Sequence, residues 1–234
     1  MAERVIGILG GMGPYATADL FREIIRLTPA RRDQEHIRVL IYSNPKIPDR
    51  TSAILGKGRD PLPALVETAK TLEKAGAGIL AIPCNAAHHF LPRLQARINI
   101  PIVSMIRETC VEICLRAPEV KAVGLLAATG TVLSRVYHEE FARAGVKVLV
   151  PDARSQERVH SAIWQVKAGT HGRVTQRTFE SIGAKLSRRG AGAVILGCTE
   201  IPLAFAPDNV DYITINATQV LAQAAVDWAL GKRR

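Results

Sequence analysis

Two cysteines, Cys84 and Cys198, stand in matching positions of the sequence and could carry chemistry together. Residues 76–84 have the sequence Gly-Ala-Gly-Ile-Leu-Ala-Ile-Pro-Cys, and residues 190–198 have the sequence Gly-Ala-Gly-Ala-Val-Ile-Leu-Gly-Cys. The thiol and thiolate forms of cysteine interconvert near a pKa of about 8.5 by transfer of one proton. Two thiols on opposite faces of an acidic carbon could therefore remove its hydrogen on one side and return one on the other, which inverts the stereocentre.

Two other interpretations of this cysteine pair stay open. Both residues could be buried apolar fillers, or they could bind zinc together with His88 and His89, although no Cys-x-x-Cys pair accompanies them. The remaining cysteines, Cys110 and Cys114, are four residues apart on the apolar stripe of an expected helix and are predicted to be core residues. Four cysteines are too few for a disulfide framework, so we expect free thiols and a cytoplasmic location.

The cysteine segments belong to a longer internal repeat. Residues 5–13 match residues 122–130 at an offset of 117 (5 to 122), and residues 76–84 match residues 190–198 at an offset of 114 (84 to 198). Two matches in the same order predict a duplicated βαβ unit of about 100 residues. Ligands bind outside the carboxyl ends of parallel strands, where both cysteines are expected. Two copies facing each other about a pseudo-twofold axis would place the thiols on opposite sides of one cleft.

Short β-branched apolar runs alternate with helical periodicity along the whole chain. The clearest helix lies between Asp60, a capping residue, and Gly76, with Pro61 in its first turn. Strand, helix and strand in this order predict an α/β fold with parallel sheets. We expect one lobe from residues 1–108 with 212–234 and a second from residues 109–211. The expected strands are residues 5–9, 37–43, 78–83, 101–105, 122–127, 146–150, 193–197 and 212–215.

Several residues near the expected strand ends could bind an anion. The turn Gly10-Gly-Met-Gly13 lacks the third glycine of a dinucleotide fingerprint and has no Gly-Lys-Ser/Thr, so it favours main-chain N–H groups that approach a carboxylate. Arg50 could hold a carboxylate with two hydrogen bonds, or it could pair with Asp49. Lys167 could be a second clamp, or a solvated lysine at a helix end. Asn85 could cap a helix whose positive end favours a thiolate at Cys84.

The composition restricts the class of protein. The chain is 47% hydrophobic and 22% charged, as ordered globular proteins are, and no apolar run approaches the roughly 18 residues that span a membrane. A net charge of +10 would suit binding of nucleic acid or of small anions. The basic residues are scattered and aromatic residues make up only 5%, which argues against nucleic acid and favours small anionic metabolites.

Five motifs together resemble the aspartate/glutamate racemase superfamily, and most closely its aspartate racemase branch. The resemblance implies two pseudo-symmetric Rossmann-like lobes with parallel sheets flanked by helices, an active site in the cleft between them, and no pyridoxal phosphate, nucleotide or metal. Relatives are often dimers, so it also implies a possible homodimer. The motifs are Gly10-Gly-Met-Gly-Pro14, Ile47-Pro-Asp-Arg-Thr51, Pro83-Cys-Asn-Ala-Ala-His88, Lys167-Ala-Gly169 and Gly197-Cys-Thr-Glu-Ile-Pro202.

By this resemblance, Cys84 and Cys198 would be the acid/base pair of a cofactor-independent racemase acting on an acidic amino acid, aspartate before glutamate. Glu200 stands where the glutamate racemase branch has histidine, which favours aspartate. Ala86 replaces a common threonine and Asn216 a common acidic residue; the missing hydroxyl at Ala86 leaves the substrate open. The implied substrate-binding residues are Met12, Arg50, Asn85, Ala86, Lys167, Thr199 and Glu200.

Two rival functions remain. One is a one-base isomerase or decarboxylase of small dicarboxylic acids within the same superfamily, and the presence of both Cys84 and Cys198 argues against it. The other is a basic protein that binds nucleic acid, which a steep dependence of binding on salt would reveal. We therefore expect a small acidic amino acid as the partner, with no nucleic acid and no membrane.

Overall fold

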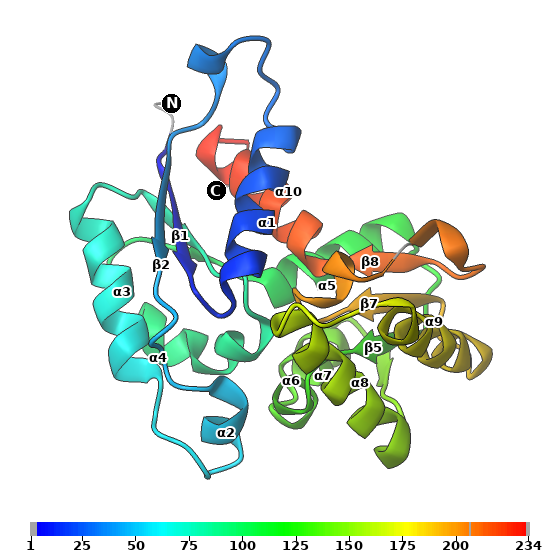
Figure 1. Ribbon diagram of the computed structural model, residues 1–234. Helices are drawn as coiled ribbons and strands as arrows, with labels where there is room; N and C mark the ends of the chain where they lie inside the picture. The colour runs from blue at the N-terminus through cyan, green and yellow to red at the C-terminus, as the bar shows by residue number, and fades with distance from the viewer. Residues whose placement is uncertain (1–3, 206, 233–234) are drawn as a thin grey trace. The chain divides into compact units, whose positions relative to one another are not determined.

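The computed structural model describes residues 4–205 and 207–232. The chain forms two compact units, each built on a four-stranded parallel sheet with helices packed against it (Figure 1). The first unit ends at Glu108 and resumes at Thr218, and the second extends from Thr109 to Ala217. The expected α/β fold with two parallel sheets is confirmed.

The first sheet has the strand order β2-β1-β3-β4. Its central strands β1 and β3 are buried along their whole length, as apolar runs in a parallel sheet covered on both faces should be. The helices α1 and α10 lie on one side of this sheet, and α3 and α4 lie on the other (Figure 1). The strands are β1 (Ile6–Gly10), β2 (Val39–Ser43), β3 (Ile79–Ala81) and β4 (Ile102–Val103). The helices are α1 (Pro14–Leu27), α2 (Arg50–Ile54), α3 (Leu62–Lys74), α4 (Leu91–Gln95) and α10 (Ala217–Ala229), with the 3₁₀ helices η1 (Asp33–Glu35) and η2 (Asn85–Phe90).

The second sheet repeats this order as β6-β5-β7-β8. The helix α9 packs on β5 and β7, and α8 packs on α9. The strands are β5 (Ala122–Leu126), β6 (Lys147–Leu149), β7 (Ala193–Leu196) and β8 (Thr214–Asn216). The helices are α5 (Met105–Arg116), which leads from the first unit into the second, α6 (Thr129–Leu133), α7 (Val136–Arg143), α8 (Ala153–Lys167) and α9 (Arg173–Arg188), with the 3₁₀ helices η3 (Ile201–Leu203) and η4 (Pro207–Asn209).

The pairing of the strands follows the sequence repeat residue by residue. Ile6 lies opposite Ile79 where β1 pairs with β3, and Val123 lies opposite Ala193 where β5 pairs with β7. The equivalent residues are 117 (6 to 123) and 114 (79 to 193) positions apart, which are the offsets of the two sequence matches. Each of the eight expected strand segments overlaps one observed strand. The two units therefore place equivalent sequence segments in equivalent strands.

The segment from 212 to 217 lies in a different unit from the one we expected. We assigned it to the first lobe, but β8 pairs with β7, with Asn216 opposite Leu196. This pairing supplies the fourth strand of the second sheet, just as β4 completes the first. Only the chain from Thr218 returns to the first unit, where the backbone N–H of Arg4 donates to the carbonyl of Ala229 over 3.0 Å.

The helix predicted between Asp60 and Gly76 is present as α3. Asp60 Oδ1 accepts the backbone N–H of Leu62 at 2.9 Å, which satisfies one of the free N–H groups of the first turn. Gly76 follows the last turn with a φ of +99°, a conformation that favours glycine. Local sequence signals thus determine both ends of this helix.

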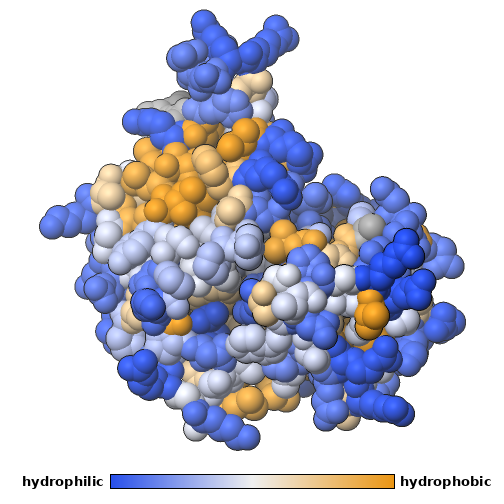
Figure 2. Space-filling model, in the orientation of Figure 1, coloured by the Kyte–Doolittle hydropathy of each residue, from blue (hydrophilic) through white to orange (hydrophobic). Residues whose placement is uncertain are grey.

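The surface of the first unit includes exposed apolar side chains at a sheet edge. Figure 2 shows apolar surface, in orange, over the region of β2 and α1. Ile41 and Tyr42 of β2 and Ile25 of α1 are exposed, and β2 is the outermost strand of its sheet. No helix in the described part of the chain has the length and apolar content that a membrane crossing requires.

Candidate active site

The predicted site residues divide between the two units. Five of them lie in the first unit and form what we call the first half-site, namely Met12, Arg50, Cys84, Asn85 and Ala86. Met12, Cys84 and Ala86 belong to one buried cluster, because the chain leaves both β1 and β3 at the same edge of the sheet. Asn85 and Arg50 are also buried. The fold thus gathers residues 12 and 84–86 from separate motifs.

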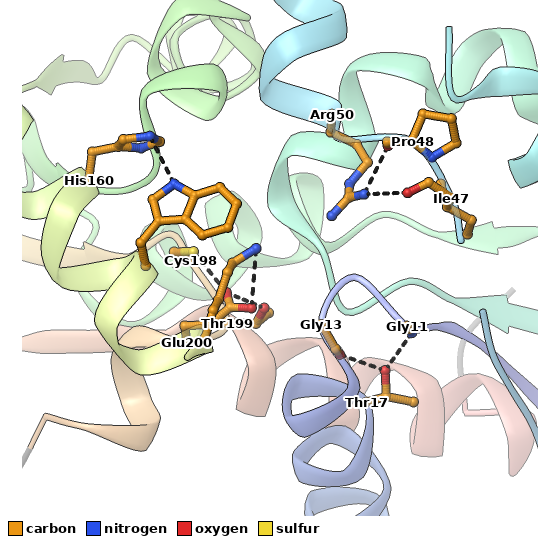
Figure 3. A network of polar contacts seen from close by, with 12 residues as sticks. Gly11, Gly13, Thr17, Ile47, Pro48, Arg50, His160, Cys198, Thr199 and Glu200 are labelled. Carbon is orange, nitrogen blue, oxygen red and sulfur yellow. Dashed lines mark hydrogen bonds and ion pairs between the residues drawn. The ribbon is translucent and has the colours of Figure 1, made fainter. Parts of the chain in front are cut away.

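The glycine turn after β1 has a shape that only glycine permits. Gly11 has a φ of +93°, and a Cβ atom there would lie 2.3 Å from the backbone of Asn44. The N–H of Gly11 donates to Thr17 Oγ1 at 2.8 Å, and the Thr17 hydroxyl donates to the carbonyl of Gly13 at 2.9 Å (Figure 3). We expected main-chain N–H groups of this turn to approach a carboxylate. The N–H of Gly11 is bound to Thr17 of α1, so for the other N–H groups of the turn the expectation stays a prediction.

Arg50 is a buried cation whose position is set by backbone carbonyls. Its Nη1 donates to the carbonyl oxygens of Ile47 at 3.1 Å and Pro48 at 2.9 Å (Figure 3). Its Nε is buried and has no hydrogen-bond partner among the described residues. Asp49, the alternative partner, caps α2 by accepting the N–H of Ser52 at 2.7 Å. Since an unsatisfied buried donor costs free energy, this guanidinium is suited to receive an anion.

His88 fixes the backbone at Cys84. The backbone N–H of Met105 donates to His88 Nε2 at 3.0 Å, so the ring proton is on Nδ1 and is donated to the carbonyl of Cys84 at 2.9 Å. Burial lowers the pKa of His88 to about 4, so the imidazole is neutral. Both ring nitrogens are engaged, and the described residues contain no group of three or more His, Cys, Asp or Glu side chains arranged for a metal. The zinc interpretation is therefore not supported.

The cap predicted at Asn85 is wrong. Cys84 itself occupies the N-cap position of η2, without a side-chain hydrogen bond, and Asn85 is the first residue of that helix. The backbone of Cys84 is still extended, with φ of −157° and ψ of 106°, so the chain turns into the helix directly after the cysteine. The helical stretch after Cys84 is divided into η2 and α4, and Pro92 lies in the first turn of α4. Cys84 therefore lies at the junction between strand and helix.

The second half-site is the group Lys167, Cys198, Thr199 and Glu200 in the second unit. Cys198 Sγ donates to Glu200 Oε2 at 3.0 Å, and the Thr199 hydroxyl donates to the same oxygen at 3.3 Å (Figure 3). Lys167 Nζ lies 3.6 Å from Glu200 Oε1. Glu200 is only 3% exposed and Cys198 is 8% exposed. Glu200 therefore binds all three of the other predicted residues in this unit.

The surroundings of Cys198 favour its protonated form. Burial raises the pKa of the Cys198 thiol well above its ordinary value, and the negative charge of Glu200 raises it further, while the Lys167 ammonium lowers it. The hydrogen bond from the thiol to Glu200 also stabilises the protonated form, because only a thiol can donate it. Without a ligand, Cys198 is therefore a neutral thiol.

Lys167 is held in place by an aromatic ring as well as by Glu200. Its Nζ lies 5.4 Å from the centroid of the Trp164 ring, which is within the range of a cation–π interaction. The indole N–H of Trp164 donates to His160 Nε2 at 3.1 Å (Figure 3), one turn earlier on α8. The side chain of Lys167 is only 26% exposed. The alternative of a solvated lysine at a helix end does not describe this residue.

Three residues of these surroundings had no motif to mark them, namely Tyr137, His160 and Trp164. Tyr137 of α7 is fully buried. Burial raises the pKa of its phenol above the ordinary range, a side-chain hydrogen bond with Thr109 opposes the rise, and the nearby Cys198 adds to it. Cys110 is also buried, and burial raises the pKa of its thiol to about 12, as expected for a core residue. The pKa of Cys110 is affected by Cys114 and Glu140, and neither of these is a predicted site residue.

Both the sequence and the structure are similar to those of known amino-acid racemases. Residues 9–225 match the Asp/Glu/Hydantoin racemase family. The chain is 28% identical over 229 residues to the broad specificity amino-acid racemase RacX of Bacillus subtilis (strain 168), covering 95% of this chain and 96% of that protein. The structure resembles the aspartate racemase of Picrophilus torridus with a TM-score of 0.85 and 29% identity, covering 97% of this chain and 94% of that one.

A more distant likeness shows the fold alone. The glutamate racemase of Francisella tularensis subsp. tularensis SCHU S4, solved in complex with D-glutamate, aligns with a TM-score of 0.71 at 16% identity, covering 99% of this chain and 83% of that one. The family expected from the five sequence motifs is thereby confirmed.

Proposed function

Because the chain belongs to the Asp/Glu/hydantoin racemase family, we propose that it is an amino-acid racemase that interconverts the L and D forms of an acidic amino acid without a cofactor. Aspartate is the proposed substrate and glutamate the second choice. One observation carries the proposal: each unit has a buried cysteine two or three positions after the last residue of the equivalent strand, Cys84 after β3 and Cys198 after β7. A two-base inversion needs one such group for each face of the reacting carbon.

The proposed reaction is a proton exchange at Cα. One cysteine, as a thiolate, removes the hydrogen as a proton; the Cα–H bond breaks, an S–H bond forms, and the electron pair is delocalised into the α-carboxylate. The other cysteine, as a thiol, then gives its proton to the opposite face; its S–H bond breaks and a new Cα–H bond forms. The product is the opposite enantiomer, and the two cysteines have exchanged their protonation states.

Charged residues in each half-site support a substrate with two carboxylates. Arg50 has a buried Nε without a hydrogen-bond partner among the described residues, which a carboxylate could satisfy. Like Arg50, Lys167 is proposed to bind the side-chain carboxylate, in competition with Glu200, 3.6 Å away. Met12, Asn85, Ala86 and Thr199 are proposed to line the rest of the site. Because RacX is named for broad specificity, a screen of the common L-amino acids for exchange of the α-hydrogen should accompany the test with aspartate.

The test is inversion in deuterium oxide. The purified protein is incubated with L-aspartate and no added cofactor, and the amino acid is analysed by chiral chromatography with mass spectrometry. We expect D-aspartate carrying deuterium at Cα. Neither exchange nor inversion with aspartate, glutamate or any amino acid of the screen would overturn the proposal.

Serine variants test the cysteine pair. Cys84→Ser and Cys198→Ser should each lower the racemisation rate by about 100-fold or more, since a hydroxyl is a far weaker acid than a thiol. Cys114→Ser is the control, because this partly exposed cysteine lies in neither half-site, and it should keep full activity. Full activity in the Cys84 or the Cys198 variant would favour the one-base isomerase or decarboxylase.

We also propose a homodimer, located in the cytoplasm. The exposed apolar residues Ile41 and Tyr42 on the edge strand β2 support an interface between copies of the chain. Light scattering during size-exclusion chromatography should give twice the mass of 25.4 kDa. A monomeric mass at micromolar concentration would contradict the dimer.

A further inference from the structure

The family resemblance implied that Glu200 binds substrate, but its carboxylate is directed at protein groups. Its Oε2 accepts hydrogen bonds from Cys198 Sγ at 3.0 Å and from the Thr199 hydroxyl at 3.3 Å. Its Oε1 is buried and accepts no hydrogen bond from the described residues, and Lys167 Nζ lies 3.6 Å from it. A buried carboxylate needs such compensation, because removing one partner leaves an uncompensated charge. Lys167, Glu200 and Cys198 therefore form one connected group of side chains, with Glu200 in contact with both of the others.

We propose that Glu200 is a positioning residue that keeps Cys198 as the protonated thiol when no substrate is bound, and that Lys167 balances the charge of Glu200. The inference rests on the proposed function, since it assigns the two cysteines different states at the start of a two-base reaction. Cys198 is then the acid, and Cys84 must be the base. The enantiomer accepted first is the one that presents its Cα–H to Cys84.

The proton balance explains why Lys167 is needed. When Cys198 gives its proton to Cα, its S–H bond breaks and a thiolate is left 3.0 Å from the Glu200 carboxylate. Two adjacent negative charges repel each other, and the Lys167 ammonium offsets part of that repulsion. A further titratable group that interacts electrostatically with Cys198 is the buried phenol of Tyr137 on α7, whose pKa burial raises above its ordinary range, so it is neutral at physiological pH. Beyond burial, the neighbouring charges that act on Cys198 are therefore those of Glu200 and Lys167.

The test measures the reactivity of Cys198 without substrate or turnover. The full-length protein is treated with iodoacetamide over a series of pH values, and mass spectrometry follows alkylation of the peptide that contains each cysteine. Only the thiolate reacts, so the rate reports the deprotonated fraction. In the wild type, the midpoint for Cys198 should lie above the ordinary value of about 8.5. A midpoint at or below that value overturns the proposal.

Two variants separate the contributions of the neighbours. Glu200→Gln removes the negative charge at nearly constant shape, so alkylation of Cys198 at pH 8 should rise about tenfold or more, which corresponds to one pKa unit. Lys167→Met removes the cation, so alkylation of Cys198 should fall below the wild-type rate. Cys84 should react at the wild-type rate in both variants. Buried Cys110 reports folding, because it becomes reactive only when the second unit opens.

The outcomes distinguish this inference from the proposed function. An unchanged Cys198 rate in Glu200→Gln, with a raised KM for aspartate, would show that Glu200 binds substrate and would overturn the inference alone. If Cys110 becomes reactive in Glu200→Gln, the Lys167→Met variant decides, and a Cys198 alkylation rate there at or above the wild-type rate overturns the inference. Because alkylation needs no racemisation, the inference can succeed even where the protein fails to invert aspartate.

Discussion

The imidazole of His88 donates a hydrogen bond from Nδ1 to the backbone carbonyl of Cys84, over 2.9 Å. The same ring accepts the N–H of Met105, at the start of α5, with its Nε2 over 3.0 Å. His88 thus connects the backbone of the proposed base to the first turn of a helix. This connection needs a neutral ring, because a protonated imidazole has no acceptor for the N–H of Met105.

The first prediction is a loss of stability below pH 6.5. The pKa of His88 is lowered by burial to about 4 in the folded protein, from an ordinary value of 6.5. Between these values the unfolded chain binds a proton that the folded chain does not, so the free energy of unfolding falls as the pH falls. The contribution over this window is about 3 kcal/mol. Urea denaturation at pH 7, 5.5 and 4.5 measures it.

The variant His88→Gln tests the origin of this pH dependence. Glutamine does not titrate, so the variant should lose about 1–3 kcal/mol at pH 7 but depend less steeply on pH than the wild type. His89→Gln is the matched control, because this neighbouring side chain is exposed and should leave both quantities unchanged. Equal pH dependence in the wild type and His88→Gln would show that another group titrates.

Signals local in sequence predicted most of the fold. The eight strands are short β-branched runs bounded by turn residues, and α3 has Asp60 before it and Gly76 after it. The repeat predicted the equivalence of Cys84 and Cys198, because duplicated segments form equivalent strands. The predicted assignment of residues 212–217 to the first lobe is wrong, because β8 pairs with β7 of the second unit. Strand pairing is a tertiary contact that no local pattern specifies.

The site was less predictable than the fold, because its contacts join residues from separate motifs. The bond between His88 and Met105 spans seventeen positions, and Tyr137 lies on a helix without any motif. Spacing put Glu200 beside Cys198, but it did not indicate that the side chain turns back onto the thiol. Motifs predict which residues belong to the site, whereas the hydrogen-bond partner of each side chain depends on tertiary packing.

The second prediction compares two glycines that both have a positive φ. Gly11 has a φ of +93° and no room for a Cβ, which would meet the backbone of Asn44 at 2.3 Å. Gly56 has a φ of +70° and no atom within 4 Å of a built Cβ. Gly56→Ala should therefore cost only the conformational penalty of about 1–2 kcal/mol. Gly11→Ala should cost more and also lower activity, because it displaces the turn that carries Met12. Urea midpoints and racemisation rates measure the difference; equal losses in the two variants would contradict the steric argument.

The third prediction concerns the geometry of the Arg50 guanidinium. Arg50→Lys keeps the positive charge but loses the planar set of donors, of which Nη1 binds the carbonyls of Ile47 and Pro48. We expect KM for aspartate to rise about tenfold or more, as for loss of a hydrogen bond to a charged group worth about 1.5–3 kcal/mol. Arg59→Lys, at an exposed position nearby in the sequence, is the control and should leave KM unchanged. A wild-type KM in Arg50→Lys would remove Arg50 from the substrate site.

The fourth prediction is that Trp164 contributes to substrate binding through Lys167. The Nζ of Lys167 lies 5.4 Å from the Trp164 ring centroid, and such contacts contribute about 0.5–1 kcal/mol at exposed sites. Trp164→Leu should raise KM for aspartate about two- to fivefold with kcat unchanged, because the loss affects the bound substrate and the transition state equally. Trp164→Phe keeps an aromatic face and should have a smaller effect.

Trp228 provides the control for this prediction, because its ring lies 5.9 Å from the guanidinium carbon of Arg4 in a similar cation–π contact of the first unit. It lies in neither half-site. Trp228→Leu should therefore lower the urea midpoint without changing KM, whereas Trp164→Leu should change KM. If both variants change stability alone, then the aromatic ring supports the helix α8 and has no part in directing Lys167. A rise in KM for Trp164→Leu with aspartate but not with an uncharged amino acid substrate would instead locate the effect at the side-chain carboxylate, where Lys167 is proposed to bind.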